Sequence, residues 1–170
     1  NECCRRSCAR IQNFIPNPTN NVHEHLSSIL KLLRLEDKLR MAVRLESQNN
    51  YERIRYLLVI TNGSDESCFL GIDYDVKATI GLVLPIWNDI QIALDGDGGF
   101  RITSGKSLHI FKPVSVQAMW SAFQALHVAS HKSIQRNFFE GGGSHQWTKF
   151  YRDRVSSNSK FLREWIITEN

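Results

Sequence analysis

The sequence predicts a mainly β (α+β) domain: a seven-stranded antiparallel barrel capped by a C-terminal helix, with an extra N-terminal helix and a helical tail. Three observations carry this prediction. Short segments of alternating apolar and polar residues recur between 41 and 111, and turn-forming residues separate most of them. One strongly amphipathic segment follows, from about 116 to 130. The length of 170 residues suits one domain with appendages.

The chain before the first strand is expected to be irregular and then helical. Residues 1–21 contain two prolines and a run of asparagines, which favours an irregular lead-in. From Val22 the pattern changes, and apolar residues recur at the spacing of one helix face, at Leu26, Ile29, Leu30 and Leu33.

Seven strands are expected next, at 41–45, 53–61, 67–73, 79–86, 90–94, 99–103 and 107–111. The second strand places Tyr56, Leu58 and Ile60 on one face, and Arg55, Leu57 and Val59 on the other. Residues 95–99 resemble the start of a calcium loop, but Lys106 stands where that loop requires a glutamate. Residues 99–107 resemble a phosphate-binding loop, but a strand follows where a helix is needed. Both segments are therefore interpreted as hairpin turns.

The amphipathic helix that begins near Val116 is expected to close one open end of the barrel, with Trp120 as a buried core residue. Seven strands followed by one such helix is the order of a pleckstrin-homology-like domain. The predicted organisation is a lead-in at 1–21, this domain at 22–133, and a helical C-terminal extension at 134–170.

Composition narrows the classes of function. Residues 62–99 hold one lysine against seven acidic residues, whereas 101–170 hold ten basic residues against four acidic ones. A nucleic-acid-binding protein more often carries a continuous basic stripe, so no nucleic-acid partner is expected. No apolar run is long enough for a membrane-spanning helix, and no signal peptide is visible. Three of the four cysteines, Cys3, Cys4 and Cys8, crowd the N-terminus, which indicates a reducing, intracellular compartment rather than a disulfide framework.

No catalytic, metal or cofactor site is expected in this chain. Cys4 and Arg10 match the spacing of a cysteine-phosphatase loop, but no strand precedes them and prolines follow at once. His127 and His131 have the spacing of a zinc pair on a helix, but no cysteine or acidic residue nearby completes the ligand set.

Basic residues gather on the first two strands, and four of them are the candidate partner-binding residues: Arg40, Arg44, Arg53 and Arg55. In many pleckstrin-homology domains, basic residues at this place bind phosphoinositide phosphates, and Arg53 and Arg55 share one strand face. The alternative is a solvated strand edge that its charges protect from aggregation. The residues alone therefore indicate a non-catalytic binding module, and they do not identify its ligand.

Four strings are more specific than composition: AVRLES at 42–47, GLVLPIW at 81–87, LDGDGGF at 94–100 and HIFKPVSVQAMWSA at 109–122. Together, and in this order between His25 and Trp165, they resemble the N-terminal region of the slingshot family of cofilin phosphatases.

The resemblance implies a pleckstrin-homology-like domain of a larger cytoplasmic protein that acts on the actin cytoskeleton. In that family a dual-specificity phosphatase domain for serine and tyrosine follows, and its catalytic residues lie outside this chain. The implied partners are actin filaments and phosphorylated cofilin. Two alternatives remain: a membrane-surface module that binds anionic phosphoinositides, and a stand-alone relative that lacks the phosphatase domain.

Overall fold

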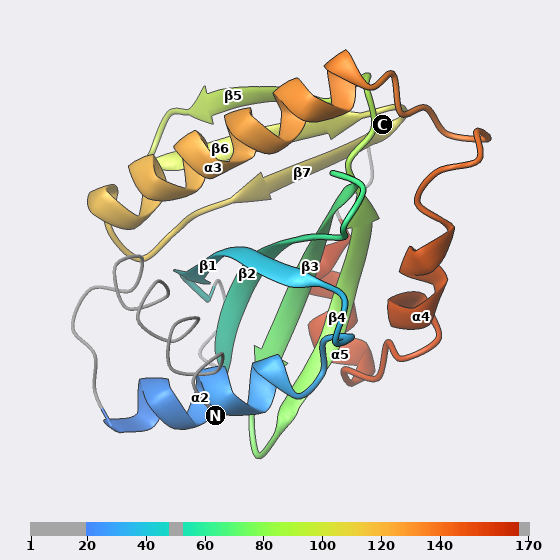
Figure 1. Ribbon diagram of the computed structural model, residues 1–170. Coiled ribbons are helices and arrows are strands. Elements are labelled where there is room, and N and C mark those ends of the chain that lie inside the picture. Colours follow the sequence, from blue (N-terminus) through green and yellow to red (C-terminus); the bar gives the residue numbers. More distant parts are fainter. Residues whose placement is uncertain (1–19, 48–52, 167–170) are drawn as a thin grey trace.

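The computed structural model describes residues 20–47 and 53–166, which form two antiparallel sheets with helices packed around them (Figure 1). Helix α2 (Asn20–Leu30) comes first and the long helix α3 (Val116–Gln135) follows the strands. Three short helices come last: η1 (Gln146–Thr148), α4 (Lys149–Arg152) and α5 (Ser159–Trp165). The strands are β1 (Lys38–Leu45), β2 (Ile54–Thr61), β3 (Ser67–Tyr74), β4 (Ala78–Pro85), β5 (Gln91–Asp95), β6 (Gly99–Ser104) and β7 (Ser107–Phe111).

Each strand lies within a few residues of its predicted range, and the two glycine-rich segments form the predicted hairpin turns. Gly98, between β5 and β6, has a φ of 81°, and Gly105, between β6 and β7, has a φ of 58°. Glycine adopts these left-handed conformations without steric cost, which accounts for its place in both turns. The predicted lead-in, apart from the first residues of α2, lies outside the described residues.

The strands form two sheets, in the orders β1-β2-β3-β4 and β5-β6-β7, and this corrects the expected barrel. Within 20–47 and 53–166, no strand ladder joins β4 to β5. Strand β4 ends at Pro85, which has no N–H to donate, and the chain then turns away before β5. On the other side the chain after β7 meets the end of β1 through a local bridge between Leu45 and Pro113. Hydrogen bonds run from Glu46 N to Lys112 O at 2.8 Å and from Val114 N to Arg44 O at 3.0 Å. The result is a half-open barrel.

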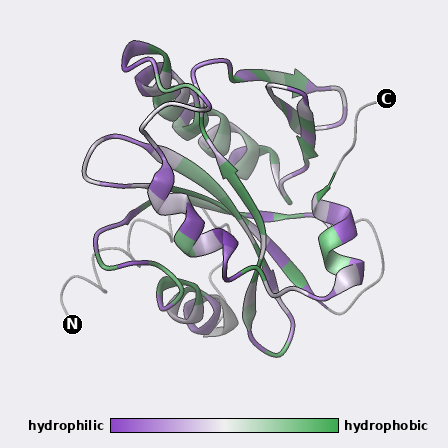
Figure 2. Cartoon of the chain, turned by 90° about the vertical axis from the view of Figure 1, so that its right-hand side faces the viewer, coloured by the Kyte–Doolittle hydropathy of each residue, from purple (hydrophilic) through white to green (hydrophobic). Residues whose placement is uncertain are grey.

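The four-stranded sheet is buried on both faces. Leu57 and Val59 face the first core, which lies between the two sheets and α3. Leu58 and Ile60 face a second core, to which α2 contributes Leu26 and Ile29 and α4 contributes Tyr151. In Figure 2 apolar colour accordingly follows the strands of this sheet. The alternation predicted for the second strand is confirmed, but apolar side chains cover both faces of this strand and not one face alone.

Helix α3 turns its small residues toward the core, and the prediction that Trp120 is a core residue is wrong. Three alanines (Ala118, Ala122 and Ala129) are buried, while Trp120 is 48% exposed and contacts Phe123 edge-on. The small side chains let the helix approach the sheets closely, and Met119 and Leu126 pack into the core beside them, whereas Trp120 lies on the outer face. None of the helices in the described ranges has the length and apolar character needed to cross a membrane.

The buried tryptophan is Trp165, the last residue of α5, and it fills the open end of the half-barrel. It is 1% exposed and its ring lies 6.3 Å from the ring of Phe111 on β7. Added Cβ atoms at Gly71 and Gly81 would lie 2.8 Å and 2.5 Å from atoms of the indole. These two strand glycines therefore provide the space for Trp165. The C-terminal helices pack into the same cores as the strands, and the domain boundary predicted at residue 134 stays a prediction.

Candidate partner-binding surface

The four candidate arginines fall into two environments. Arg40 and Arg44 are exposed on β1, which is an edge strand of the four-stranded sheet. Arg53 and Arg55 are only 6% and 7% exposed, and their side chains point into the end of the half-barrel that Trp165 fills. Of the four candidate partner-binding residues, only Arg40 and Arg44 therefore face solvent.

Arg53 and Arg55 are buried because acidic and aromatic groups from distant segments surround them. Nη1 of Arg53 donates to Asp73 on β3, and Nη2 forms an ion pair with Glu164 on α5. Nε of Arg55 lies 3.5 Å from the same Glu164 oxygen, and its Nη1 donates to the carbonyl of Glu46 at 3.2 Å. Two cations and two carboxylates make this cluster formally neutral, which is the usual condition for burying charge.

Aromatic rings complete the cluster. The ring of Phe161 lies 4.1 Å from Cζ of Arg53, and that of Trp165 lies 4.2 Å from Cζ of Arg55. The indole N–H of Trp165 donates to Asp73 at 2.9 Å. Burial lowers the pKa of Arg55, and the nearby Glu164 acts in the opposite direction. We call Arg53, Arg55, Asp73 and Glu164 the buried quartet. Sequence reasoning missed its two acidic members, although the strand glycines Gly71 and Gly81 were a signal that a large side chain packs there.

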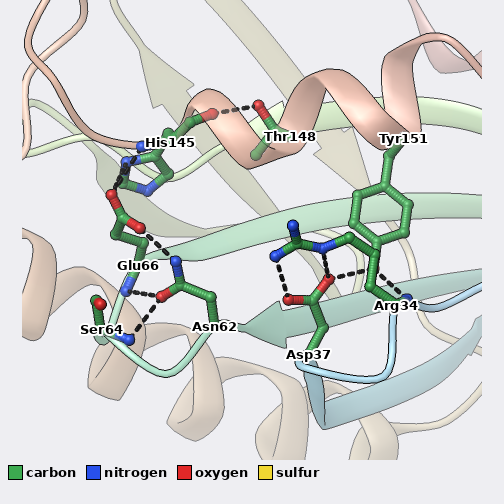
Figure 3. Close-up of polar contacts among 8 residues, drawn as sticks. All are labelled: Arg34, Asp37, Asn62, Ser64, Glu66, His145, Thr148 and Tyr151. Carbon is green, nitrogen blue, oxygen red and sulfur yellow. Dashed lines mark hydrogen bonds and ion pairs between the residues drawn. The ribbon is translucent and has the colours of Figure 1, made fainter.

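Two polar clusters hold the C-terminal helices on the sheet (Figure 3). In the first, Asp37 accepts hydrogen bonds from the Arg34 guanidinium at 2.9 Å and from the hydroxyl of Tyr151 on α4. The Tyr151 oxygen in turn accepts from the backbone N–H of Arg34 at 3.0 Å. Burial, and then the bond to Asp37, raises the pKa of Tyr151. The cluster joins the turn after α2 to α4.

The second cluster surrounds His145, which precedes η1. Its backbone N–H donates to Glu66 at 2.8 Å, and Asn62 donates to the same carboxylate (Figure 3). The ring of His145 lies between Trp87, at 4.5 Å, and Phe138, at 5.3 Å between centroids. Thr148 closes the turn by donating to the carbonyl of His145 at 2.7 Å. This cluster ties the segment before α4 to the β2–β3 turn.

Acid is expected to destabilise the domain through three buried histidines. Burial lowers the pKa of His25, His109 and His145 below the ordinary value of 6.5. Because these pKa values are lower in the folded state, the unfolded chain binds more protons below pH 6.5. The stabilisation that comes from the neutral histidines is therefore complete above pH 6.5 and is lost as the pH falls through their folded-state pKa values. Melting temperatures measured from pH 7.5 to 5 should fall, and His145→Gln should reduce the slope. Equal slopes for parent and variant would exclude His145.

The outer face of α3 exposes several large apolar side chains. Val116, Trp120, Val128 and Ile134 are each at least 48% exposed. An open hollow of about 570 Å³ adjoins the C-terminal half of the helix, between His127 and Gln135. His127 and His131 lie along it, but among the described residues no group of three or more His, Cys, Asp or Glu side chains is placed to hold a metal ion. The Cys4–Arg10 match lies outside the described residues.

Comparison with known proteins adds family information. A family model described as "Protein phosphatase Slingshot homolog 1-like, PH domain-like" matches residues 25–167. Protein phosphatase Slingshot homolog 1 of Mus musculus is 45% identical over 150 residues, which cover 84% of this chain and 14% of that protein. Slingshot homolog 2 of Homo sapiens is 42% identical over 167 residues, which cover 94% of this chain and 12% of that protein. Slingshot of Drosophila melanogaster is 33% identical over 231 residues, which cover 92% of this chain and 22% of that protein. No solved structure gives a significant match.

Proposed function

Because this chain belongs to the Slingshot family of protein phosphatases, whose N-terminal pleckstrin-homology-like region it forms, we propose that it is a non-catalytic, protein-binding regulatory domain. In this proposal it contributes to the recognition of phosphorylated cofilin and to activation by actin filaments, in the cytoplasm at the actin cytoskeleton. The chain spans 14% of the murine relative. The phosphatase reaction is accordingly assigned to other parts of a full-length protein.

The observation that carries the proposed binding surface is the exposure of Arg40 and Arg44. Both lie on edge strand β1, and neither forms an ion pair with a carboxylate of the described residues. Filaments and a phosphorylated partner both present negative charge, which these two guanidinium groups complement. Exposed charges of this kind mainly change the association rate and its salt dependence.

Replacing Arg40 and Arg44 together by glutamate is expected to weaken binding without changing the melting curve. Each exposed charge contributes about 1 kcal/mol or less, so the double variant should bind roughly three- to tenfold more weakly, most clearly at low salt. Co-sedimentation with actin filaments and pull-down with phosphorylated cofilin measure the two partners separately.

The matched control reverses two exposed lysines in turns, Lys77→Glu with Lys106→Glu, which changes net charge equally but leaves β1 intact. If the Arg40/Arg44 variant bound its partners as strongly as the parent at low salt, β1 would not be part of the binding surface. Sedimentation with phosphoinositide vesicles, but not with filaments or cofilin, would favour the lipid-binding alternative.

A further inference from the structure

Strand β5 lies at the margin of the three-stranded sheet and has one free edge (Figure 1). On its inner side it pairs with β6 along its whole length, from Gln91 to Asp95. On its outer side no main-chain hydrogen bond reaches these five residues from any other part of the described chain. A free edge presents a row of unpaired N–H and C=O groups, which is the template that another extended strand requires.

The side chains of β5 do not protect this edge. Ile92 packs against the first core, and Leu94, two residues later, points to the same face but is 50% exposed. Ala93 stands between them, exposed on the opposite face. Proteins usually blunt an edge strand with lysine, proline or a β-bulge. Strand β5 has no lysine or proline, and its pairing with β6 runs without a register shift.

Helix α3, which packs against β5 and β6, carries a row of aromatic rings on the flank that borders this edge. The rings of Trp120, Phe123 and His127 follow one another edge-on, with centroids 6.0 Å and 4.4 Å apart. Lys132 stands nine residues after Phe123, which is two and a half helical turns, and its Nζ lies 3.3 Å from Asp65 in the turn after β2. Because Lys132 faces the four-stranded sheet, the aromatic row lies on the opposite flank, toward the three-stranded sheet.

The sequence of β5 is complementary to itself in an antiparallel register centred on Ala93. In that register Ala93 stands opposite Ala93 of a second copy, Ile92 opposite Leu94, and Gln91 opposite Asp95. Apolar side chains thus meet on the core face, the Gln91 amide has a carboxylate to donate to, and no like charges are opposed. A shift by one residue would set core-facing side chains against solvent-facing ones, so the pleat selects against it.

We propose that two copies of this chain associate through β5 as a two-fold symmetric dimer, in which the two three-stranded sheets join into one. The two-fold axis is perpendicular to the joined sheet, so both α3 helices lie on the same face and their aromatic rows face each other across the joint. Five paired residues provide less than the roughly 800 Å² per partner of a standard interface, and the aromatic rows add apolar area. The dimer uses neither Arg40 nor Arg44, so it is separate from the surface proposed above.

Sedimentation equilibrium of the whole chain over a range of concentrations tests the dimer. The average mass of the parent should rise from the 19.6 kDa of the monomer toward twice that value. Ala93→Arg should keep the monomer mass at every concentration, because the symmetry brings its two guanidinium groups together. Leu35→Arg is the matched control, since it adds the same charge at a fully exposed side chain in the turn after α2, far from β5 (Figure 1). It should associate like the parent.

Two further measurements locate the contact. Trp120→Ser should associate about tenfold more weakly than the parent, because aromatic residues dominate the binding energy of interfaces. Amide hydrogen exchange of the parent should slow in β5 as concentration rises and stay unchanged in β1, the edge strand of the other sheet. Unchanged exchange in β5 would show that another surface mediates the association.

A parent that stays monomeric at every concentration, or an Ala93→Arg variant that associates as well as Leu35→Arg, would overturn the dimer. If the parent were monomeric and Ala93→Arg, but not Leu35→Arg, lost binding to filaments or to phosphorylated cofilin, the edge of β5 would instead be assigned to an extended segment of that partner. The dimer and the proposed function therefore fail separately.

Discussion

Alanine at Leu58 is expected to destabilise the domain as strongly as alanine at Leu57, by about 2–5 kcal/mol in each case. The two residues are neighbours on β2, point to opposite faces of the sheet and are both 0% exposed. Leu57 belongs to the core between the sheets, and Leu58 to the core under α2 and α4. Urea unfolding of the two variants measures both losses on the same scale.

The control for this pair is Leu94→Ala, because Leu94 is 50% exposed on β5. Surface substitutions of this kind usually change stability by about 0.5 kcal/mol or less. A barrel whose outer surface faced solvent would show a large loss at Leu57 and a small one at Leu58. That result would contradict the second core.

Alanine at Gly71 is expected to expel Trp165 and to lower the free energy of unfolding by about 3 kcal/mol, near the cost of truncating a large buried aromatic residue. The added methyl group would lie 2.8 Å from atoms of both the indole and Leu82. The part of this loss that comes from the indole has an upper bound, namely the free energy with which α5 docks, because beyond that bound the helix leaves and the sheet remains folded. Denaturant unfolding followed by tryptophan fluorescence measures the effect.

Gly63→Ala is the matched control, since an added methyl there meets no atom within 4 Å. It should be nearly neutral. In the double variant Gly71→Ala with Trp165→Ala, the two losses should not add, because the indole that the methyl would displace is already gone. Additive losses would show that Leu82, rather than Trp165, resists the methyl group.

The strands could be predicted from the sequence because their signals are local. Strand β7 lies at 107–111 as predicted, and the alternation in β2 correctly assigns Leu57 and Leu58 to opposite faces. What an alternating pattern does not reveal is whether the second face is covered. That depends on α2 and α4, which reach the sheet from opposite ends of the chain.

The position of the buried tryptophan could not be predicted in the same way. Helix α3 has apolar residues on both faces, so its pattern predicts a helix but not which side packs. The alanines at 118, 122 and 129 indicated the side that packs, since close helix packing favours small residues. Trp165 stands in a short helix at the end of the chain, where amphipathic spacing is too brief to be informative.

The role of the four arginines in binding stays a prediction, and the burial of two of them could not be predicted from the sequence. Arg55 lies on β2 and Arg53 directly before it, and Arg40 and Arg44 are on the surface. The burial of the first pair depends on Asp73 and Glu164. Glu164 lies far from β2 in the sequence, and only the three-dimensional fold brings its carboxylate to the arginines. An ion pair between residues this far apart produces no periodic pattern in the sequence.

The closure of the half-barrel by Trp165 has a consequence for the order of events on the ribosome. The indole and its acceptor Asp73 are separated by 92 positions in the chain. At a synthesis rate of about 5–20 residues per second, Asp73 waits roughly 5 to 20 seconds for the indole that donates to it to be made. During that interval Gly71 and Gly81 border an unfilled space and the arginine pair faces water. The nascent domain therefore passes through a stage in which its strands are complete and the space for its buried tryptophan is still open.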